Sequence, residues 1–271
     1  MASNFKLNKM KRIDKSLSER VQRSLAFVES LELPPLPRRK RGGPMTTAQS
    51  VFDKTKDQSM LIGSDIVSFV AGTTPEMREI IMNCSLLAQL AANQRVSSRD
   101  DIRGWYELYF DTLTHLGWTA QERGFSEHHE AGSNFETNQA ILSIAAVVLG
   151  PAATAYAVVE STLNAMKSMS DGPWMRIFDR ESQSANAARF QVTVAEPPSN
   201  GGSMISLMAF ELHAKTTLTQ VLFFKFNSAD VTLRHASGRV TIDTALLAPL
   251  QATIAQKVSA FTRSYVDALL L

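Results

Sequence analysis

Carboxylate and imidazole side chains, which suit acid–base or metal chemistry, gather in one short stretch. Residues 127–130 read Glu-His-His-Glu, and His115 and Glu122 lie nearby. Neighbouring residues of a strand point to opposite faces, so at most one of His128 and His129 can join a given site. The repeated spacings of zinc sites, such as His-x3-His and Cys-x2-Cys, are absent. We predict an exposed polar loop and no metal site; a metal-assisted hydrolase using His128 or His129 is only a third hypothesis.

Other residues of catalytic type lack the partners that a reaction needs. His213 and His235 fall on neighbouring predicted strands, without a nucleophile or a metal ligand set beside them. Asp100 and Asp101 stand at a helix start, where the helix dipole accounts for them. The sequence has no Gly-x-Ser-x-Gly, Gly-x-Gly-x-x-Gly, Walker, His-Glu-x-x-His or Cys-x-x-Cys motif. We therefore predict no catalytic residues, no cofactor and no enzymatic activity.

The single cysteine and an aromatic stripe both indicate core packing. Cys84 has no partner for an internal disulfide, and it lies within an apolar run that makes it a small core residue. The stripe could bind a sugar or a base, but packing against a core is the commoner use of such residues. Its members are Trp105, Tyr106, Tyr109 and Phe110.

A long uncharged stretch over residues 134–169 organises the rest of the chain. No charged side chain occurs between Thr137 and Val159. Gly150-Pro151 stands in its middle, where a Gly can end one helix and a Pro suits the first turn of the next. We predict two short helices folded into an αα-hairpin. The residues expected to form its membrane or assembly surface are Ile141, Leu142, Ile144, Val147, Val148, Leu149, Gly150, Pro151, Val158 and Val159.

Three locations are open for this hairpin. It can stay buried in a soluble core, or it can leave that core and enter a bilayer, as α-helical pore-forming toxins do. The likeness to those toxins is one of physical type, without a shared motif. A constitutive membrane span is the third alternative, and the many Ala, Ser and Thr residues and the central Pro argue against it.

The N-terminal residues 1–57 are expected to form a basic arm, extended or partly helical. Up to Met45 eleven Lys or Arg stand against four acids, a balance of +7, which leaves −5 for the remainder of a chain whose net charge is +2. The cluster Arg38, Arg39, Lys40 and Arg41 follows a proline-rich segment. It can be a solvated tether, an anionic-membrane contact, a protease site or a nucleic-acid contact, and the last is disfavoured because interleaved aromatics are absent.

The remaining pattern predicts an α+β fold in one body, residues 58–271. A strand over 61–70 is followed by helices from about 74 to 169, which include the hairpin. Strands are expected at 190–195, 204–213, 218–226, 231–235 and 239–242, and a long helix then runs to Leu269. These elements predict an N-terminal helical half followed by a sheet of four or five antiparallel strands, about 188–271, covered by the C-terminal helix.

These features together favour binding or assembly over catalysis. Our leading hypothesis is a toxin-like or effector-like protein whose hairpin and basic arm engage an anionic membrane or direct assembly. The alternative is a soluble homo-oligomer or filament in which the arm reaches a neighbouring subunit. The first 30 residues lack the apolar core of a signal peptide, so we expect synthesis in the cytoplasm, with export by a non-classical route left open.

Overall fold

The computed structural model describes residues 2–36, 52–120, 124–129, 133–169, 172–199, 202–218, 220–223 and 225–269. In the first helix it describes side chains from Lys15 onward. The α-helices are α1 (Ala2–Ser30), α2 (Pro75–Arg95), α3 (Ile102–His115), α4 (Thr137–Leu149), α5 (Thr154–Ser168), α6 (Pro173–Ser182), α7 (Thr244–Leu247) and α8 (Gln251–Tyr265). Two short 3-10 helices are η2 (Ser228–Asp230) and η3 (Ala248–Leu250).

The strands come from both halves of the chain. They are β1 (Gln58–Ile62), β2 (Asp65–Phe69), β3 (Trp118–Ala120), β4 (Ser126–His128), β5 (Asn134–Glu136), β6 (Ala187–Ser199), β7 (Gly202–Ala214), β8 (Lys225–Asn227), β9 (Val231–Ile242) and β10 (Val266–Leu269). The main sheet has the order β10-β1-β2-β6-β7-β9-β3, with β4 also paired to β9. Strand β2 pairs with β6 in parallel, and the other pairs of this sheet are antiparallel.

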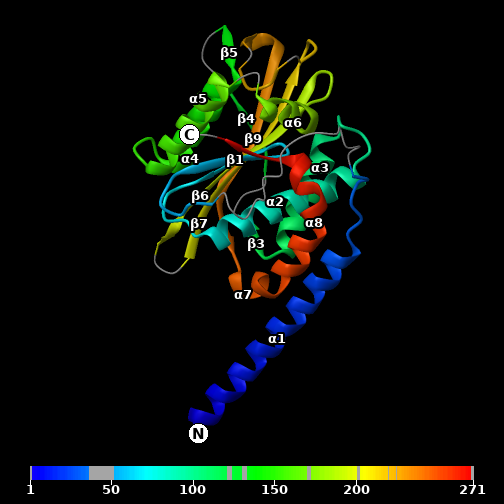
Figure 1. The fold of residues 1–271 in the computed structure, drawn as a ribbon, viewed down its shortest axis with the longest axis vertical. Helices are drawn as coiled ribbons and strands as arrows, with labels where there is room; N and C mark the ends of the chain where they lie inside the picture. The colour runs from blue at the N-terminus through cyan, green and yellow to red at the C-terminus, as the bar shows by residue number, and fades with distance from the viewer. Residues whose placement is uncertain are drawn as a thin grey trace.

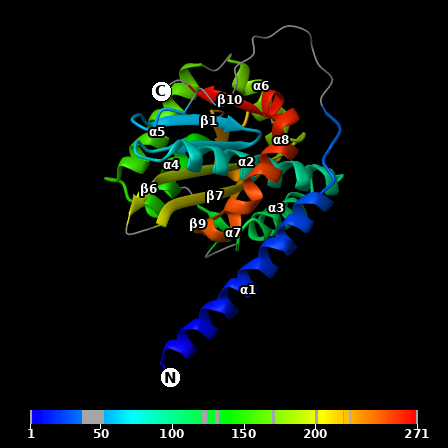
Figure 2. The same ribbon diagram turned by 60° about the horizontal axis from the view of Figure 1, so that its bottom comes forward.

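Helices cover both faces of this sheet, so the body has three layers (Figure 1). We call α4, α5 and α6 the hairpin layer, and α2, α3 and α8 the α2–α3 layer; Figure 2 shows the sheet between them. Alternate side chains of the central strands serve the two faces, as a strand's period of two requires. Val192 and Phe210 belong to the core under the hairpin layer, whereas Ile205 and Leu207 belong to the core under the α2–α3 layer.

The predicted α+β class is confirmed, but the predicted sheet is wrong in size and connection. Instead of four or five late strands, an eight-stranded sheet recruits β1 to β4 from the N-terminal half. The parallel pairing of β2 with β6 joins Asp65 to Gln191 in register, across more than a hundred residues of intervening chain. Local spacing predicts hairpins, and it holds no signal for a pairing at that distance.

Three local predictions are also corrected. The strand expected over 61–70 is a hairpin of β1 and β2 that turns at Gly63, whose φ of 59° is one that few other residues adopt. The two strands expected at 231–235 and 239–242 are one strand, β9. The C-terminal helix stops at Tyr265 because the next residues pair with β1 as strand β10.

The predicted central strand at 218–226 is wrong as well. Among the described residues of this segment, a strand begins only at Lys225: β8, Lys225–Asn227, which pairs with β5 in a separate two-stranded sheet. Val221 and Leu222 are fully or almost fully buried, but as a turn that fills the core under the hairpin layer. Apolar residues in succession showed burial correctly, and they did not distinguish a strand from a buried turn.

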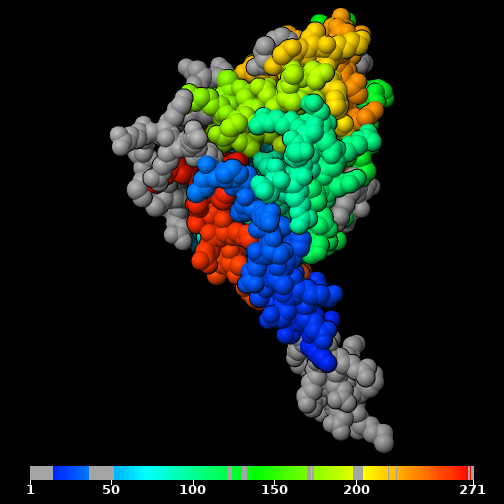
Figure 3. All heavy atoms as spheres, turned by 90° about the vertical axis from the view of Figure 1, so that its right-hand side faces the viewer, coloured from blue at the N-terminus to red at the C-terminus, as the bar shows by residue number. Residues whose placement is uncertain are grey.

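The first part of the expected arm is helix α1, and its C-terminal half lies on the body. Val28 is buried, Ser24 Oγ donates to the His115 carbonyl at 2.7 Å, and the Phe27 ring stacks on His115 at 3.9 Å between ring centroids. Arg20 pairs with Asp243 at 2.9 Å. Figure 3 shows this half of α1 against α8 and α3, whereas the N-terminal half extends past the body in Figures 1 and 2.

Candidate functional site

The hairpin has the two helices and the break that the sequence predicts. Helix α4 ends at Leu149, and Gly150 follows with φ of 91° while its N–H donates to the Ala146 carbonyl at 3.0 Å. A Cβ at this position would meet nothing within 4 Å, so the glycine serves the backbone conformation and not a close approach. The chain then turns and α5 begins at Thr154.

The ten predicted hairpin residues divide into a buried, a half-buried and an exposed set. Ile141, Ile144, Val158 and Val159 are at most 4% exposed and pack in the core under the hairpin layer. Leu142, Val148, Leu149 and Gly150 are half-buried, and Pro151 is exposed. Val147 is 86% exposed, and Leu36 is the only other large apolar side chain in the described chain that is classed as exposed. The end of the hairpin, residues 147–151, is therefore an apolar tip.

Apolar contact provides most of the attachment between α5 and the sheet, with one buried polar tie. Thr162 Oγ1 lies 2.6 Å from Ser59 Oγ of β1 and 3.3 Å from Ser68 Oγ of β2, and the two serine oxygens are 3.0 Å apart. All three residues are at most 2% exposed. We call these residues the hydroxyl tie.

The chain entering the hairpin is held by a small sheet. Strand β5 runs directly into α4 and pairs with β8, and Lys225 Nζ lies 2.8 Å from Glu136 Oε1 across this pair. The hydrogen bond from Lys225 lowers the pKa of Glu136. The Asn138 N–H of α4 donates to the Leu222 carbonyl at 3.0 Å.

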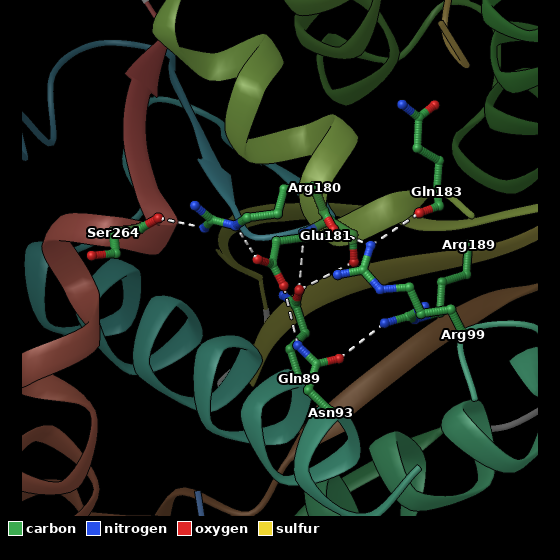
Figure 4. Close-up of polar contacts among 9 residues, drawn as sticks. Gln89, Asn93, Arg99, Arg180, Glu181, Gln183, Arg189 and Ser264 are labelled. Carbon is green, nitrogen blue, oxygen red and sulfur yellow. Dashed lines mark hydrogen bonds and ion pairs between the residues drawn. The ribbon is translucent and has the colours of Figure 1, made fainter. Parts of the chain in front are cut away.

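The chain leaving the hairpin is fixed much more firmly, through α6 (Figure 4). Glu181, 8% exposed, accepts from Arg180 Nε at 2.6 Å and from Asn93 Nδ2 of α2 at 3.1 Å. Asn93 Oδ1 in turn accepts from Arg189 Nη2 at 2.9 Å and from the Trp105 indole at 2.7 Å. Each bond to a charged group contributes more than a neutral one, so this network is a strong anchor.

Arginines complete this anchor at the end of α6. Arg180 Nη2 donates to the Ser264 carbonyl at 2.8 Å, and Arg99 Nη1 donates to the carbonyls of Arg180 and Gln183 at 2.9 and 3.2 Å. Burial lowers the pKa of Arg189 to about 10, and its guanidinium lies 4.4 Å from the Trp105 ring centroid. The hairpin layer thus has one fixed end, at α6.

The segment around residues 127–130, expected to be an exposed polar loop, instead supplies strand β4, Ser126–His128, which pairs with β9. His128 of β4 and His235 of β9 have ring centroids 6.4 Å apart. Burial lowers the pKa of His235, and the neighbouring His128 lowers it further. Over the ranges that the structure describes, no group of three metal-ligating side chains is close enough to hold an ion. Burial raises the pKa of the Cys84 thiol to about 12.

Sequence patterns missed two features of this site, the hydroxyl tie and the α6 anchor. The hydroxyl tie and the α6 anchor join residues separated by up to 103 positions in the chain, and no local pattern signals either. The basic cluster Arg38, Arg39, Lys40 and Arg41 lies outside the described residues. In the described chain, every helix is too short or too polar to cross a membrane.

Fold and site together define a three-layer α+β protein with an apolar-tipped helical hairpin as one outer layer. No family model matches the sequence, and no curated protein matches it. Solved structures give only weak likenesses.

A delta-endotoxin has a TM-score of 0.37 and 13% identity, over 77% of this chain and 90% of that chain. The activated Cyt2Ba monomer from Bacillus thuringiensis subsp. israelensis has a TM-score of 0.29 and 16% identity, over 51% and 79%. The Evf virulence factor has a TM-score of 0.34 and 11% identity, over 79% and 85%. At these TM-scores the likenesses carry no argument about this protein.

Proposed function

We propose that this protein is a non-enzymatic, toxin-like or effector-like protein that engages anionic membranes with the tip of the α4–α5 hairpin. The observation that carries the proposal is the apolar tip, with Val147 86% exposed at the end of a helix without a charged side chain. An exposed apolar tip is costly in water and favourable at the headgroup–acyl boundary of a bilayer.

Helix length limits how the hairpin can act. At 1.5 Å per residue, α4 and α5 are roughly 20 and 22 Å long, short of the roughly 30 Å hydrocarbon core. We therefore propose that the tip enters the interfacial region first, and that α4 and α5 then swing away from the sheet. The α6 anchor holds the far end during that movement. The basic cluster at residues 38–41 would add attraction to anionic lipid. Proteolytic cleavage there would remove the restraint that the N-terminal arm places on assembly.

The hydroxyl tie offers a direct test of this release. Ser59 Oγ and Thr162 Oγ1 are 2.6 Å apart, so Ser59→Cys/Thr162→Cys places two sulfurs where a disulfide can join β1 to α5. Cys84 is buried with a raised pKa and should not compete. On phosphatidylglycerol-containing vesicles we expect the oxidised double variant to release trapped dye at least tenfold more slowly than the reduced one. Thr162→Cys alone is the control and should not respond to oxidant.

A matched pair of tip variants tests the contact itself. Val147→Asp should abolish sedimentation with the same vesicles, because a carboxylate at the tip opposes burial and is repelled by anionic lipid. Ser143→Asp adds the same charge one helical turn earlier, at another exposed position, and should retain at least half of the binding. Equal dye release by locked and reduced protein would contradict hairpin release. Absence of binding at every pH and after clipping near Arg41 would contradict the membrane function altogether.

A second candidate function is a homo-oligomer in which the N-terminal segment contacts a neighbouring subunit. The observation that favours it is the course of α1, whose C-terminal half is bonded to the body while its N-terminal half extends beyond it (Figures 1 and 2).

A further inference from the structure

A groove between α2 and α8 has an apolar floor and an acidic rim. It encloses a cavity of about 360 Å³, which is at the lower end of the size of ligand pockets. Ile80 and Ala252 contribute accessible apolar surface, Glu76 and Glu79 line the α2 side, and Gln251 lines the α8 side. The groove is on the opposite face of the sheet from the hairpin, so the proposed membrane contact does not use it.

The two carboxylates of this rim have no cation of their own in the described chain. No Lys or Arg side chain of that part lies within 4.0 Å of Glu76 or Glu79, although ten other ion pairs are formed. Arg78 stands between them in sequence but is fully buried and donates to the carbonyls of Thr73 and Lys56 instead. The rim is therefore a negative patch open to an outside cation.

The chain contains a segment of matching chemistry. Residues 2–14 of α1 carry Lys6, Lys9, Lys11 and Arg12 against Asp14, a balance of +3, and they include apolar residues such as Met10 and Ile13. A helix of 13 residues is roughly 20 Å long. The walls of the groove, residues 76–84 and 247–255, each run for roughly 13 Å if taken as helix, so two to three turns of such a helix can lie along them.

This segment cannot reach the groove of its own molecule, because α1 is fixed in another position. Residues 20–29 of α1 are joined to the body by Arg20 to Asp243, Ser24 to the His115 carbonyl and Lys257 to the Glu29 carbonyl, at 2.9, 2.7 and 2.9 Å. The straight helix continues from there away from the body (Figures 1 and 2). A segment held outside its own subunit is available to a neighbour.

We propose that the groove between α2 and α8 receives the basic N-terminal half of α1 from a second copy of this chain. The Lys and Arg side chains meet Glu76 and Glu79, and apolar residues of the helix cover Ile80 and Ala252. The surfaces joined are different on the two subunits, so the contact is heterologous and generates a ring or a filament. The inference deepens the second candidate function and is independent of the membrane contact.

A charge-swap experiment on the full-length protein tests the contact. Sedimentation should show wild-type mass rising above the 29.8 kDa monomer with concentration, and falling back as salt screens the charges. Glu76→Lys/Glu79→Lys should weaken self-association at least tenfold, and so should Lys9→Glu/Arg12→Glu. An equimolar mixture of these two variants should assemble again, because each supplies the helix that the other's groove now requires. Glu107→Lys/Glu160→Lys makes the same charge change at two exposed positions elsewhere and should assemble like wild type.

Three results would overturn the proposal. They are a wild-type protein that stays monomeric at all concentrations, groove variants that assemble as well as wild type, and a mixture that does not recover.

Binding of another occupant in the groove would give a different result in the same variants. If the groove holds the chain's own cluster at residues 38–41, Glu76→Lys/Glu79→Lys stays monomeric like wild type and is clipped faster by trypsin at Arg41. None of these outcomes depends on vesicle binding, so the membrane proposal stands or fails separately.

Discussion

The two helical layers are attached to the same sheet by different kinds of contact. Buried directional hydrogen bonds join the α2–α3 layer to it: Gln89 Nε2 donates to the Ile62 carbonyl at 2.8 Å, and Gln89 Oε1 accepts from Ser64 N at 2.9 Å. The Tyr106 hydroxyl lies 2.8 Å from the carbonyl oxygens of both Phe190 and Phe210. In the hairpin layer, α5 has only the hydroxyl tie to the sheet among the side-chain bonds of the described residues.

This difference matters when a layer has to leave the sheet. Hydrogen bonds broken inside a low-dielectric core leave unpaired polar groups, each costing about 1–3 kcal/mol. Apolar contacts have no such directional requirement, and lipid can replace them. Under the proposed membrane function, α4 and α5 are therefore the helices that leave the sheet, whereas α6 and the α2–α3 layer stay in place.

The largest expected effect comes from removing a directional bond of the α2–α3 layer. Gln89→Ala leaves the Ile62 carbonyl and the Ser64 N–H without their partners, so we expect the free energy of unfolding to fall by about 2–5 kcal/mol. Urea denaturation followed by circular dichroism measures it. Gln256→Ala, at an exposed position of α8, should change that free energy by less than about 0.5 kcal/mol. A similar loss in both variants would remove the distinction between the layers.

A second test uses the pH response of the contact between β2 and α2, where Ser85 of α2 donates to Asp65 of β2 at 2.8 Å. Burial raises the pKa of Asp65 to about 7 from its ordinary value of 3.8, against the lowering effect of hydrogen bonds from Ser85 and Thr193. The folded state therefore binds this proton more tightly than the unfolded state. The free energy of unfolding should fall as pH rises from about 4 through 7, by no more than about 4 kcal/mol. Above pH 7 the contribution is constant.

Asp65→Asn should flatten that dependence between pH 5 and pH 8, as measured by urea denaturation at each pH. Asp179→Asn is the comparison variant. Burial raises the pKa of Asp179 only to about 6, so this substitution should flatten the pH dependence of the free energy of unfolding less than Asp65→Asn does. Helices α4 and α5 carry only Glu160 and Lys167 as charged side chains, and both are exposed. Hydrogen exchange in the hairpin, corrected for intrinsic rates, should consequently change less with pH than exchange in α2. An unaltered pH slope in Asp65→Asn would contradict this assignment.

These contrasts also show which parts of the molecule the sequence could predict. The hairpin was predictable because its signals are local: an uncharged run interrupted by Gly150-Pro151. The hydroxyl tie that joins it to the sheet was not predictable, because Ser59 and Thr162 are 103 residues apart and serine and threonine occur throughout the sequence. Likewise, residues 266–269 continue the helical spacing of α8, and only the presence of β1 beside them makes them a strand.

The candidate site was predictable to the same extent. A continuous apolar pattern named the ten hairpin residues, but it could not separate Val158, 3% exposed, from Val147, 86% exposed. That separation depends on tertiary packing, because Val158 lies in the core under the hairpin layer while Val147 lies outside that core at the end of the hairpin. The groove between α2 and α8 is also a product of packing, since its two walls lie about 170 residues apart in the chain.

A smaller effect should follow from weakening the hydroxyl tie without changing its shape. Thr162→Val removes one hydroxyl, while Ser59 and Ser68 can still bond to each other at 3.0 Å, so we expect a loss of about 1 kcal/mol. The loss should be local. Hydrogen exchange should speed up in α4 and α5 and stay unchanged in α2 and α3, and dye release from vesicles should become faster. Equal acceleration in both layers would mean that the sheet and its helices open as one unit.

The smallest effect on stability should come from the tip, which makes it the sharpest separation of folding from function. Val147 is 86% exposed, so Val147→Ser gives up little buried area and should alter the free energy of unfolding by less than about 0.5 kcal/mol. Vesicle sedimentation should nevertheless weaken severalfold, because an isopropyl group enters the bilayer interface more favourably than a hydroxymethyl group. Unchanged vesicle binding in Val147→Ser would show that the tip contributes nothing to membrane contact, and that any exposed surface that binds lipid lies elsewhere on the body.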